Sequence, residues 1–124
     1  MDICKHSESC GGCIYQGVPY QEQIILKGRE VLRLLEEKNI SYEKYLGIEG
    51  SPQRQAYRNK MEYTFGDEIK HGDMTLGMHK KGRFMSIVTV DECQLVDADF
   101  NMILKATLDF CRNKGYSFYH KKSH

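Results

Sequence analysis

Three cysteines lie close together near the start of this 124-residue chain, as Cys4, Cys10 and Cys13 in the stretch CKHSESCGGC. Disulfides, a bound metal or chance could bring three thiols into one short loop. A chain of this length can bury a core without covalent crosslinks, so its stability does not require disulfides. The clustering of the cysteines therefore indicates a chemical role of the thiols.

The first residues, Met-Asp-Ile-Cys, have neither the basic stretch nor the apolar run of a signal peptide, and no run of eighteen apolar residues occurs. We therefore expect a cytoplasmic protein without a membrane span. In a reducing compartment, clustered cysteines are more often metal ligands or redox groups than disulfides. The five cysteines are also an odd number, and the sequence favours a metal.

A tetrahedral metal site needs a fourth ligand besides the three in the loop. We expect Cys93, in VDECQL directly after a predicted strand, because a strand end gives a fixed point for attaching the loop. Cys111 lies at helical spacing among apolar residues and is better explained as a core residue. Gly11 and Gly12 would let the backbone curl so that its N–H groups point at sulfur.

Four thiolates suit zinc and a 4Fe-4S cluster alike, and this spacing matches neither a zinc ribbon nor a bacterial ferredoxin. The residues alone leave the two open. His6 could replace one cysteine in a zinc site, although a histidine in a polar loop is more often simply solvated.

The rest of the chain predicts an α+β fold in which a small antiparallel β-meander packs with two helices. Residues 19–39 have apolar side chains at helical spacing, with proline at the start. Residues 57–90 contain three strand-like runs, separated by polar turns that contain glycine. Two runs alternate apolar and polar side chains, and the third, Phe84 to Val90, is richer in β-branched residues. Residues 97–115 predict a second helix with Asp97 or Asp99 as N-cap and Gly115 as the closing glycine. The stretch YSFYH after it could form one more short strand.

We expect these elements to form a single domain over residues 1–124, with the cysteine loop in residues 1–18. Gly28 lies inside the first predicted helix, where glycine costs roughly 1 kcal/mol relative to alanine. It either weakens the prediction of a helix or lets another segment pack closely there. The net charge is only +1, but residues 51–90 contain seven Lys and Arg against four Asp and Glu. The region of the predicted sheet is therefore basic.

Three stretches are similar to a known family: CKHSESCGGCIYQGVPYQEQIILKGREVL, YRNKMEYTFG and LGMHKKGRFMSIVTVDECQL. In this order they resemble the iron–sulfur and RNA-binding region of the RumA-like RNA uracil-5-methyltransferases, which act on 23S ribosomal RNA. The resemblance implies a 4Fe-4S cluster held by Cys4, Cys10, Cys13 and Cys93. It also implies ribosomal RNA as the partner, and we expect no obligate protein partner.

The resemblance implies a methyltransferase domain after this region, with S-adenosylmethionine, a catalytic cysteine nucleophile and a general base. The chain has no Gly-rich nucleotide-binding loop, and Cys111 is not in the family's nucleophile motif. We therefore expect no catalytic residue in this chain, and no methyl transfer by it alone. In the family that it resembles, many members begin with a small β-barrel domain of the TRAM type, which we do not expect here because the cysteine loop starts at Cys4.

Two groups of cationic and flat side chains are the predicted RNA contacts, because RNA loops offer phosphates and unstacked bases. They lie in RQAYRNK and HKKGR, at the ends of the same predicted strands: Arg54, Tyr57, Arg58, Asn59 and Lys60, then His79, Lys80, Lys81 and Arg83. A smaller group is His120, Lys121 and Lys122. Because an anionic cluster would repel phosphates, we expect it to act as a clamp that joins the cysteine loop to the end of the third strand.

Two other functions fit the residues. One is a zinc-stabilised nucleic-acid-binding module, which would contain zinc without sulfide. The other is a small electron-transfer iron–sulfur protein, which would show a reversible reduction potential and no affinity for RNA.

Overall fold

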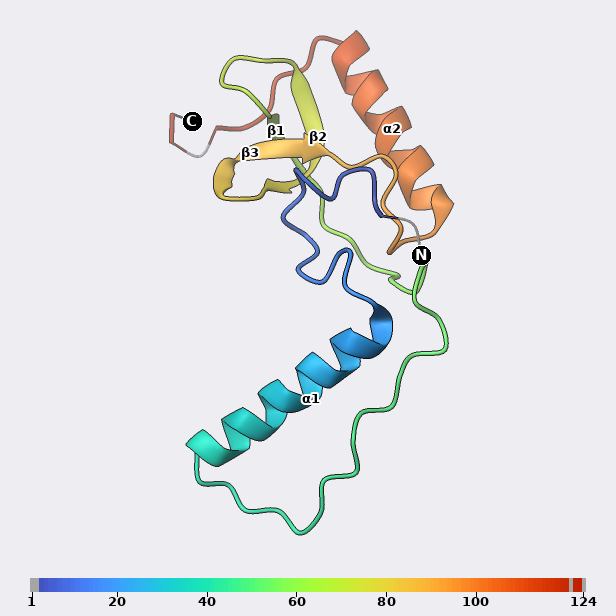
Figure 1. Ribbon diagram of the computed structural model, residues 1–124. Helices are drawn as coiled ribbons and strands as arrows, with labels where there is room; N and C mark the ends of the chain where they lie inside the picture. The colour runs from blue at the N-terminus through green and yellow to red at the C-terminus, as the bar shows by residue number, and fades with distance from the viewer. Residues whose placement is uncertain (1–2, 121, 124) are drawn as a thin grey trace. The chain divides into compact units, whose positions relative to one another are not determined.

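The structure is a computed structural model that describes residues 3–120, 122 and 123. These residues contain two α-helices and one three-stranded antiparallel sheet, so the predicted α+β fold is confirmed (Figure 1). The chain divides into two compact units, one of Met1–Gln16 with Gln53–His124 and the other of Gly17–Pro52. Within the described residues, no helix combines the length and the hydrophobicity of a membrane span.

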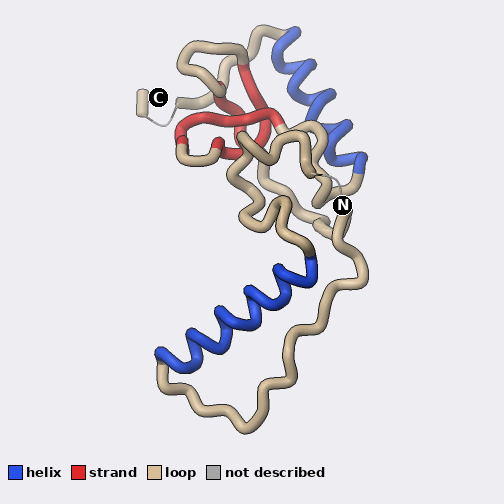
Figure 2. The backbone as a smooth tube through the Cα atoms, viewed as in Figure 1, coloured by secondary structure: helices blue, strands red, loops and turns tan. Residues whose placement is uncertain are grey.

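The sheet belongs to the first unit and is a meander of β1 (Thr64–Asp67), β2 (Met74–Lys80) and β3 (Arg83–Thr89). β2 lies in the centre, and both pairings are antiparallel (Figure 2, red segments). Phe65 lies opposite Leu76 in one pair, and Met78 lies opposite Val88 in the other. The meander predicted from the alternating side chains is therefore present.

β1 begins only at Thr64, later than the predicted start of the meander at residue 57. In the described part of the chain, the backbone of the segment before β1 forms hydrogen bonds with the segment after β3 and not with β2. The N–H groups of Ala56 and Arg58 donate to the carbonyl oxygens of Gln94 and Leu95, each at 2.9 Å. An alternating pattern predicts an extended segment, but it does not specify which neighbour supplies the hydrogen bonds.

The core of this unit lies between the sheet and α2 (Ala98–Asn113). Leu104 and Leu108 of the helix pack with Leu76 and Val90, and each of the four is at most 5% exposed. Full burial of such a side chain contributes about 1.5–3 kcal/mol, so this cluster holds α2 against the sheet.

The ends of α2 are close to those predicted. The carboxylate of Asp97 accepts a hydrogen bond from a backbone N–H of the first turn at 3.0 Å, as an N-cap does. Beyond the helix, Gly115 has φ of +67°, a conformation that glycine adopts without strain. Residues 116–120 form no strand, which corrects the expectation for YSFYH. The N–H of Tyr116 donates instead to the carbonyl oxygen of Cys111, which is half-buried.

The second unit consists of α1 (Tyr20–Glu37) and the segment 38–52 that follows it. α1 ends at Glu37 with Lys38 as C-cap, close to the predicted end at residue 39, and Asn39 has φ of +53°. Gly28 is buried, and a Cβ there would lie 2.6 Å from the hydroxyl oxygen of Tyr45. Of the two alternatives for Gly28, the close approach is the one present, with the segment after the helix as the neighbour.

Candidate metal centre

The cysteine loop lies against the turn between β2 and β3. Cys10 forms an antiparallel β-bridge to this hairpin. The N–H of Gly11 donates to the carbonyl oxygen of His79 at 2.9 Å, and the N–H of Lys81 donates to that of Ser9 at 2.8 Å. A Cβ at Gly11 would lie only 3.0 Å from the His79 oxygen, so glycine lets the two backbones approach this closely.

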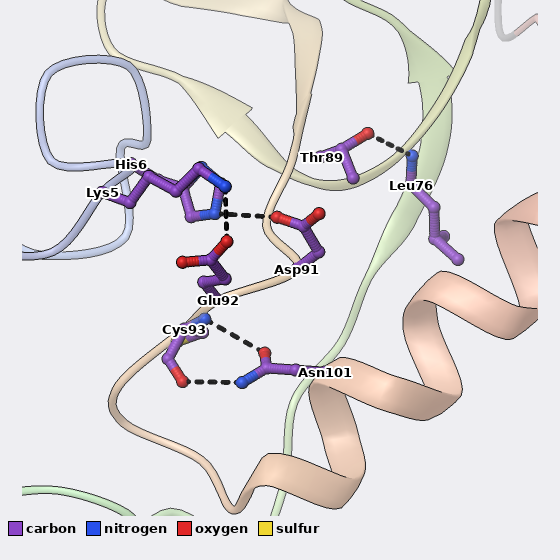
Figure 3. Close-up of polar contacts among 8 residues, drawn as sticks. All are labelled: Lys5, His6, Leu76, Thr89, Asp91, Glu92, Cys93 and Asn101. Atoms are coloured by element: carbon purple, nitrogen blue, oxygen red, sulfur yellow. Dashed lines mark hydrogen bonds and ion pairs between the residues drawn. The ribbon is translucent and has the colours of Figure 1, made fainter.

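Two side-chain contacts attach the start of the loop to the residues after β3 (Figure 3). The ammonium of Lys5 pairs with the carboxylate of Glu92, and this hydrogen bond raises the pKa of Lys5. Nε2 of His6 lies 3.1 Å from Oδ1 of Asp91. His6 therefore faces a carboxylate, and this contact competes with the role of zinc ligand that the sequence left open.

Cys93 is positioned by α2 (Figure 3). Its N–H donates to Oδ1 of Asn101 at 3.0 Å, and Nδ2 of Asn101 donates to its carbonyl oxygen at 3.1 Å. Asn101 was not predicted as a site residue, because an asparagine near the start of a helix carries no local sign that it binds a distant backbone.

All four predicted cysteine ligands line one pocket: Cys4, Cys10, Cys13 and Cys93. Each of them is half-buried, and Cys111 does not line this pocket. Apolar side chains form much of the wall: Met61, Met78, Val90 and Leu95. Within the described part of the chain, no three His, Cys, Asp or Glu side chains converge closely enough to hold one metal ion. The four predicted ligands therefore surround one pocket, although their side chains do not converge on a single point in the described residues.

The electrostatics of the pocket disfavour free thiolates. Burial raises the pKa of the Cys10 and Cys13 thiols, and the negative charge that the other cysteines carry as thiolates raises it further. The N–H of Gly12 donates to Sγ of Cys10 at 3.3 Å and acts in the opposite direction. Metals bind thiolates, so a cation among these sulfurs would lower the pKa of the thiols, although no three of them converge on one ion in the described residues. Only one of the two glycine N–H groups predicted to face sulfur does so, since that of Gly11 binds the hairpin.

Arg58 lines the cysteine pocket, although the sequence analysis considered it only as an RNA contact. Its positive charge lowers the pKa of the Cys13 thiol, against the larger effect of burial. Nη1 of Arg58 lies 3.9 Å from Sδ of Met61, which also lines the pocket. The guanidinium therefore supplies positive charge close to the thiols, and its contact with RNA stays a prediction.

The hydroxyl of Tyr63 is a second feature that the sequence analysis missed. It is buried and has no hydrogen-bond partner among the described residues. Burial raises the pKa of Tyr63, and the charge of a Cys93 thiolate raises it further. An unpaired buried donor costs about 1–3 kcal/mol. Tyr63 is not among the residues that line the cysteine pocket, so its hydroxyl is not a ligand to that space.

The two predicted RNA-contacting groups lie in different structural settings. The group from His79 to Arg83 lies in the β2–β3 hairpin, as predicted. The group from Arg54 to Lys60 precedes β1, so it does not lie at the end of a strand, which corrects that expectation. Three of the lysines have protein partners: Lys60 with Glu62 at 2.9 Å, Lys80 with Glu68 at 3.1 Å, and Lys81 with the carbonyl of Ser7.

The other predicted contacts are mostly exposed: Arg54, Tyr57, Asn59 and Arg83. His79 is half-buried. Of the smaller group at the end of the chain, His120 and Lys122 are exposed, and Lys121 lies outside the described residues. Contact of these residues with RNA stays a prediction.

Comparison with known proteins gives a consistent set of relatives, although no protein-family model and no solved structure matches. An uncharacterized RNA methyltransferase of Clostridium acetobutylicum is 48% identical over 121 residues, which are 98% of this chain and 26% of that protein. An uncharacterized RNA methyltransferase of Caldanaerobacter subterraneus is 46% identical over 98% of this chain and 27% of its own length. One of Bacteroides thetaiotaomicron is 32% identical over 95% of this chain and 29% of its length.

The chain thus spans only about a quarter of the length of these curated relatives. The similarity nevertheless covers nearly all of the chain. Over this span, the chain belongs to the family of RNA methyltransferases that these relatives represent.

Proposed function

We propose that this chain is the cluster-bearing, RNA-recognising region of an S-adenosylmethionine-dependent 23S ribosomal RNA uracil-5-methyltransferase. One observation carries the proposal: the pocket lined by Cys4, Cys10, Cys13 and Cys93 occurs in a chain whose relatives are named RNA methyltransferases. The pocket accounts for the clustering of the thiols, and the relatives' name supports RNA as the partner.

In this proposal the four cysteines hold a 4Fe-4S cluster, for which four thiolates are the usual ligands. The half-buried thiols and the apolar wall support this assignment, because they limit the access of water to the centre. When bound, the cluster supplies a covalent link between the cysteine loop and Cys93. The contacts of Lys5 and His6 already hold the loop beside the residues before Cys93. The cluster therefore reinforces a docking that the protein makes by itself.

The docked loop also supports the hairpin that carries the predicted RNA contacts. Lys81 binds the loop through its backbone N–H and through its ammonium group. Any displacement of the loop would therefore move the basic turn between β2 and β3. The loop and its metal would thus fix the position of the cations that meet the phosphates, without contacting RNA themselves.

Methyl transfer needs groups that we assign to the larger part of the relatives' length, which this chain does not span. Methylation of uracil at C5 requires a thiolate that adds to C6, and the resulting enolate then attacks the sulfonium methyl group. A base then removes the C5 proton, and the thiolate leaves. The residues of this chain would bind and orient the RNA during these steps.

The test uses the full-length protein, purified without oxygen. We expect about four iron and four sulfide ions per chain. We also expect release of tritium from a 23S RNA transcript labelled at uracil C5 once S-adenosylmethionine is added. Zinc without sulfide would reject the cluster in favour of a zinc-stabilised module. Methylation of the transcript without release of tritium would reject uracil C5 as the target.

A further inference from the structure

An aromatic pair spans the β2–β3 hairpin. The rings of His79 and Phe84 are stacked, with centroids 4.5 Å apart and planes inclined by 7°. Nδ1 of His79 lies 2.6 Å from the carbonyl oxygen of Phe84. A carbonyl oxygen only accepts, so Nδ1 carries the proton and donates to it. Phe84 therefore fixes the His79 ring in two ways, through ring stacking and through its backbone carbonyl oxygen.

The pair exposes one flat aromatic surface. His79 is half-buried and covers one face of the Phe84 ring, whereas the Phe84 residue is 68% exposed. A phenylalanine that is only a core residue would turn its ring away from water. Here the ring is fixed on one side and open on the other, which is the arrangement that a stacking ligand requires.

The surroundings of the ring are cationic. Lys81 lies in the turn, Arg83 is the first residue of β3 directly after it, and Lys80 is the last residue of β2 before it. Glu68 offsets the charge of Lys80, since their side chains pair at 3.1 Å. An exposed aromatic ring beside positive charge matches a flat ligand attached to a negatively charged backbone, which is the chemistry of a nucleotide in a single strand.

We infer that the Phe84 ring, supported by His79, is a platform on which one unpaired RNA base stacks while Lys81 and Arg83 attract the adjoining phosphates. This inference rests on the proposed function, because it names the part of the RNA that the hairpin recognises. His79 acts as a positioning residue: it orders the Phe84 ring before binding, so less conformational freedom is lost when the base stacks. A duplex would not bind this platform, because its bases are already stacked on one another.

The test compares short single-stranded RNAs of equal charge that either carry all their bases or lack them at every second position. Binding to the full-length protein is followed by fluorescence anisotropy. We expect the wild-type protein to prefer the intact strand by about tenfold or more. Phe84→Ala should remove this preference while it retains weak electrostatic binding, and Phe84→Tyr should keep it. Phe84→Leu, which is apolar but not aromatic, should behave like the alanine variant.

The matched control is Phe110→Ala, which removes another exposed phenylalanine, on α2. It should leave the preference unchanged. Because Phe84 is exposed, its variants should unfold at nearly the same urea concentration as the wild type. If Phe84→Ala keeps the full preference for the intact strand, the platform is refuted although RNA binding stands. If the wild-type protein binds neither strand nor a 23S RNA transcript, the proposed RNA recognition fails, and the platform fails with it.

Discussion

The side-chain amide of Asn101 forms two hydrogen bonds with the backbone of Cys93, one with its N–H at 3.0 Å and one with its carbonyl oxygen at 3.1 Å. Asn101 lies near the start of α2, and Cys93 lies after the end of β3. The residue that carries the fourth proposed sulfur ligand is therefore fixed to the helix that forms the core of the unit. This contact explains how a residue in irregular structure can hold a defined position.

Asn101→Ala should lower the free energy of unfolding by about 1–3 kcal/mol, because it leaves two backbone groups of Cys93 without their partner. Urea unfolding of the 124-residue chain measures the effect. Asn101→Asp should have an intermediate effect, since it keeps the acceptor and loses the donor. Asn113→Ala, at the exposed end of the same helix, is the control and should change stability by less than about 0.5 kcal/mol. Equal stability of the two alanine variants would contradict the role of Asn101.

Cys93→Ser should prevent the full-length protein from retaining its iron and sulfide, because Cys93 lines the pocket. Cys111→Ser should not, because Cys111 lies outside the pocket. Both variants should keep the circular dichroism of the folded sheet and helices, since the sulfur of Cys93 is not part of the core cluster. Loss of the link should also make trypsin cleave faster after Lys5, which is exposed. Wild-type iron content in Cys93→Ser would remove Cys93 from the ligand set.

Local patterns in the sequence predicted those features that depend on neighbouring residues. Asp97 as an N-cap and Gly115 beyond the helix follow from the orphan N–H and C=O groups at the ends of any helix. Cys93 entered the proposed ligand set because it follows a predicted strand, and it lines the same pocket as the loop cysteines.

Pairings between distant segments could not be predicted in this way. The bridge between Cys10 and Lys80 joins residues far apart in the chain, and neither residue type favours the other. The same holds for the hydrogen bond from Arg58 to Leu95, which directs the segment before β1 away from the sheet. Backbone groups are chemically alike at every position, so their choice of partner follows from the whole fold.

Gly77→Ala should be strongly destabilising. A Cβ at this position in β2 would lie 1.9 Å from the carbonyl oxygen of Val88 and 2.9 Å from the backbone nitrogen of Val90. Because both neighbours are backbone atoms of the adjacent segment, the strands would have to separate, and we expect a loss of roughly 3 kcal/mol or more. Gly82→Ala is the control: no atom lies within 4 Å, and only its φ of +68° should cost about 1 kcal/mol. Urea unfolding of the two variants under the same conditions should show the difference.

Arg83→Ala should make RNA binding less dependent on salt. Arg83 is exposed in the basic hairpin, and each phosphate contact that is lost removes one released counterion. The slope of the logarithm of the binding constant against the logarithm of salt concentration should become shallower by about 0.7–0.9, whatever the RNA sequence. The measurement is a salt titration of full-length protein with a 23S RNA transcript. Lys105→Ala removes an exposed cation of α2 and should leave the slope as it is, so an equal change in both variants would indicate a general effect of net charge and no contact at Arg83.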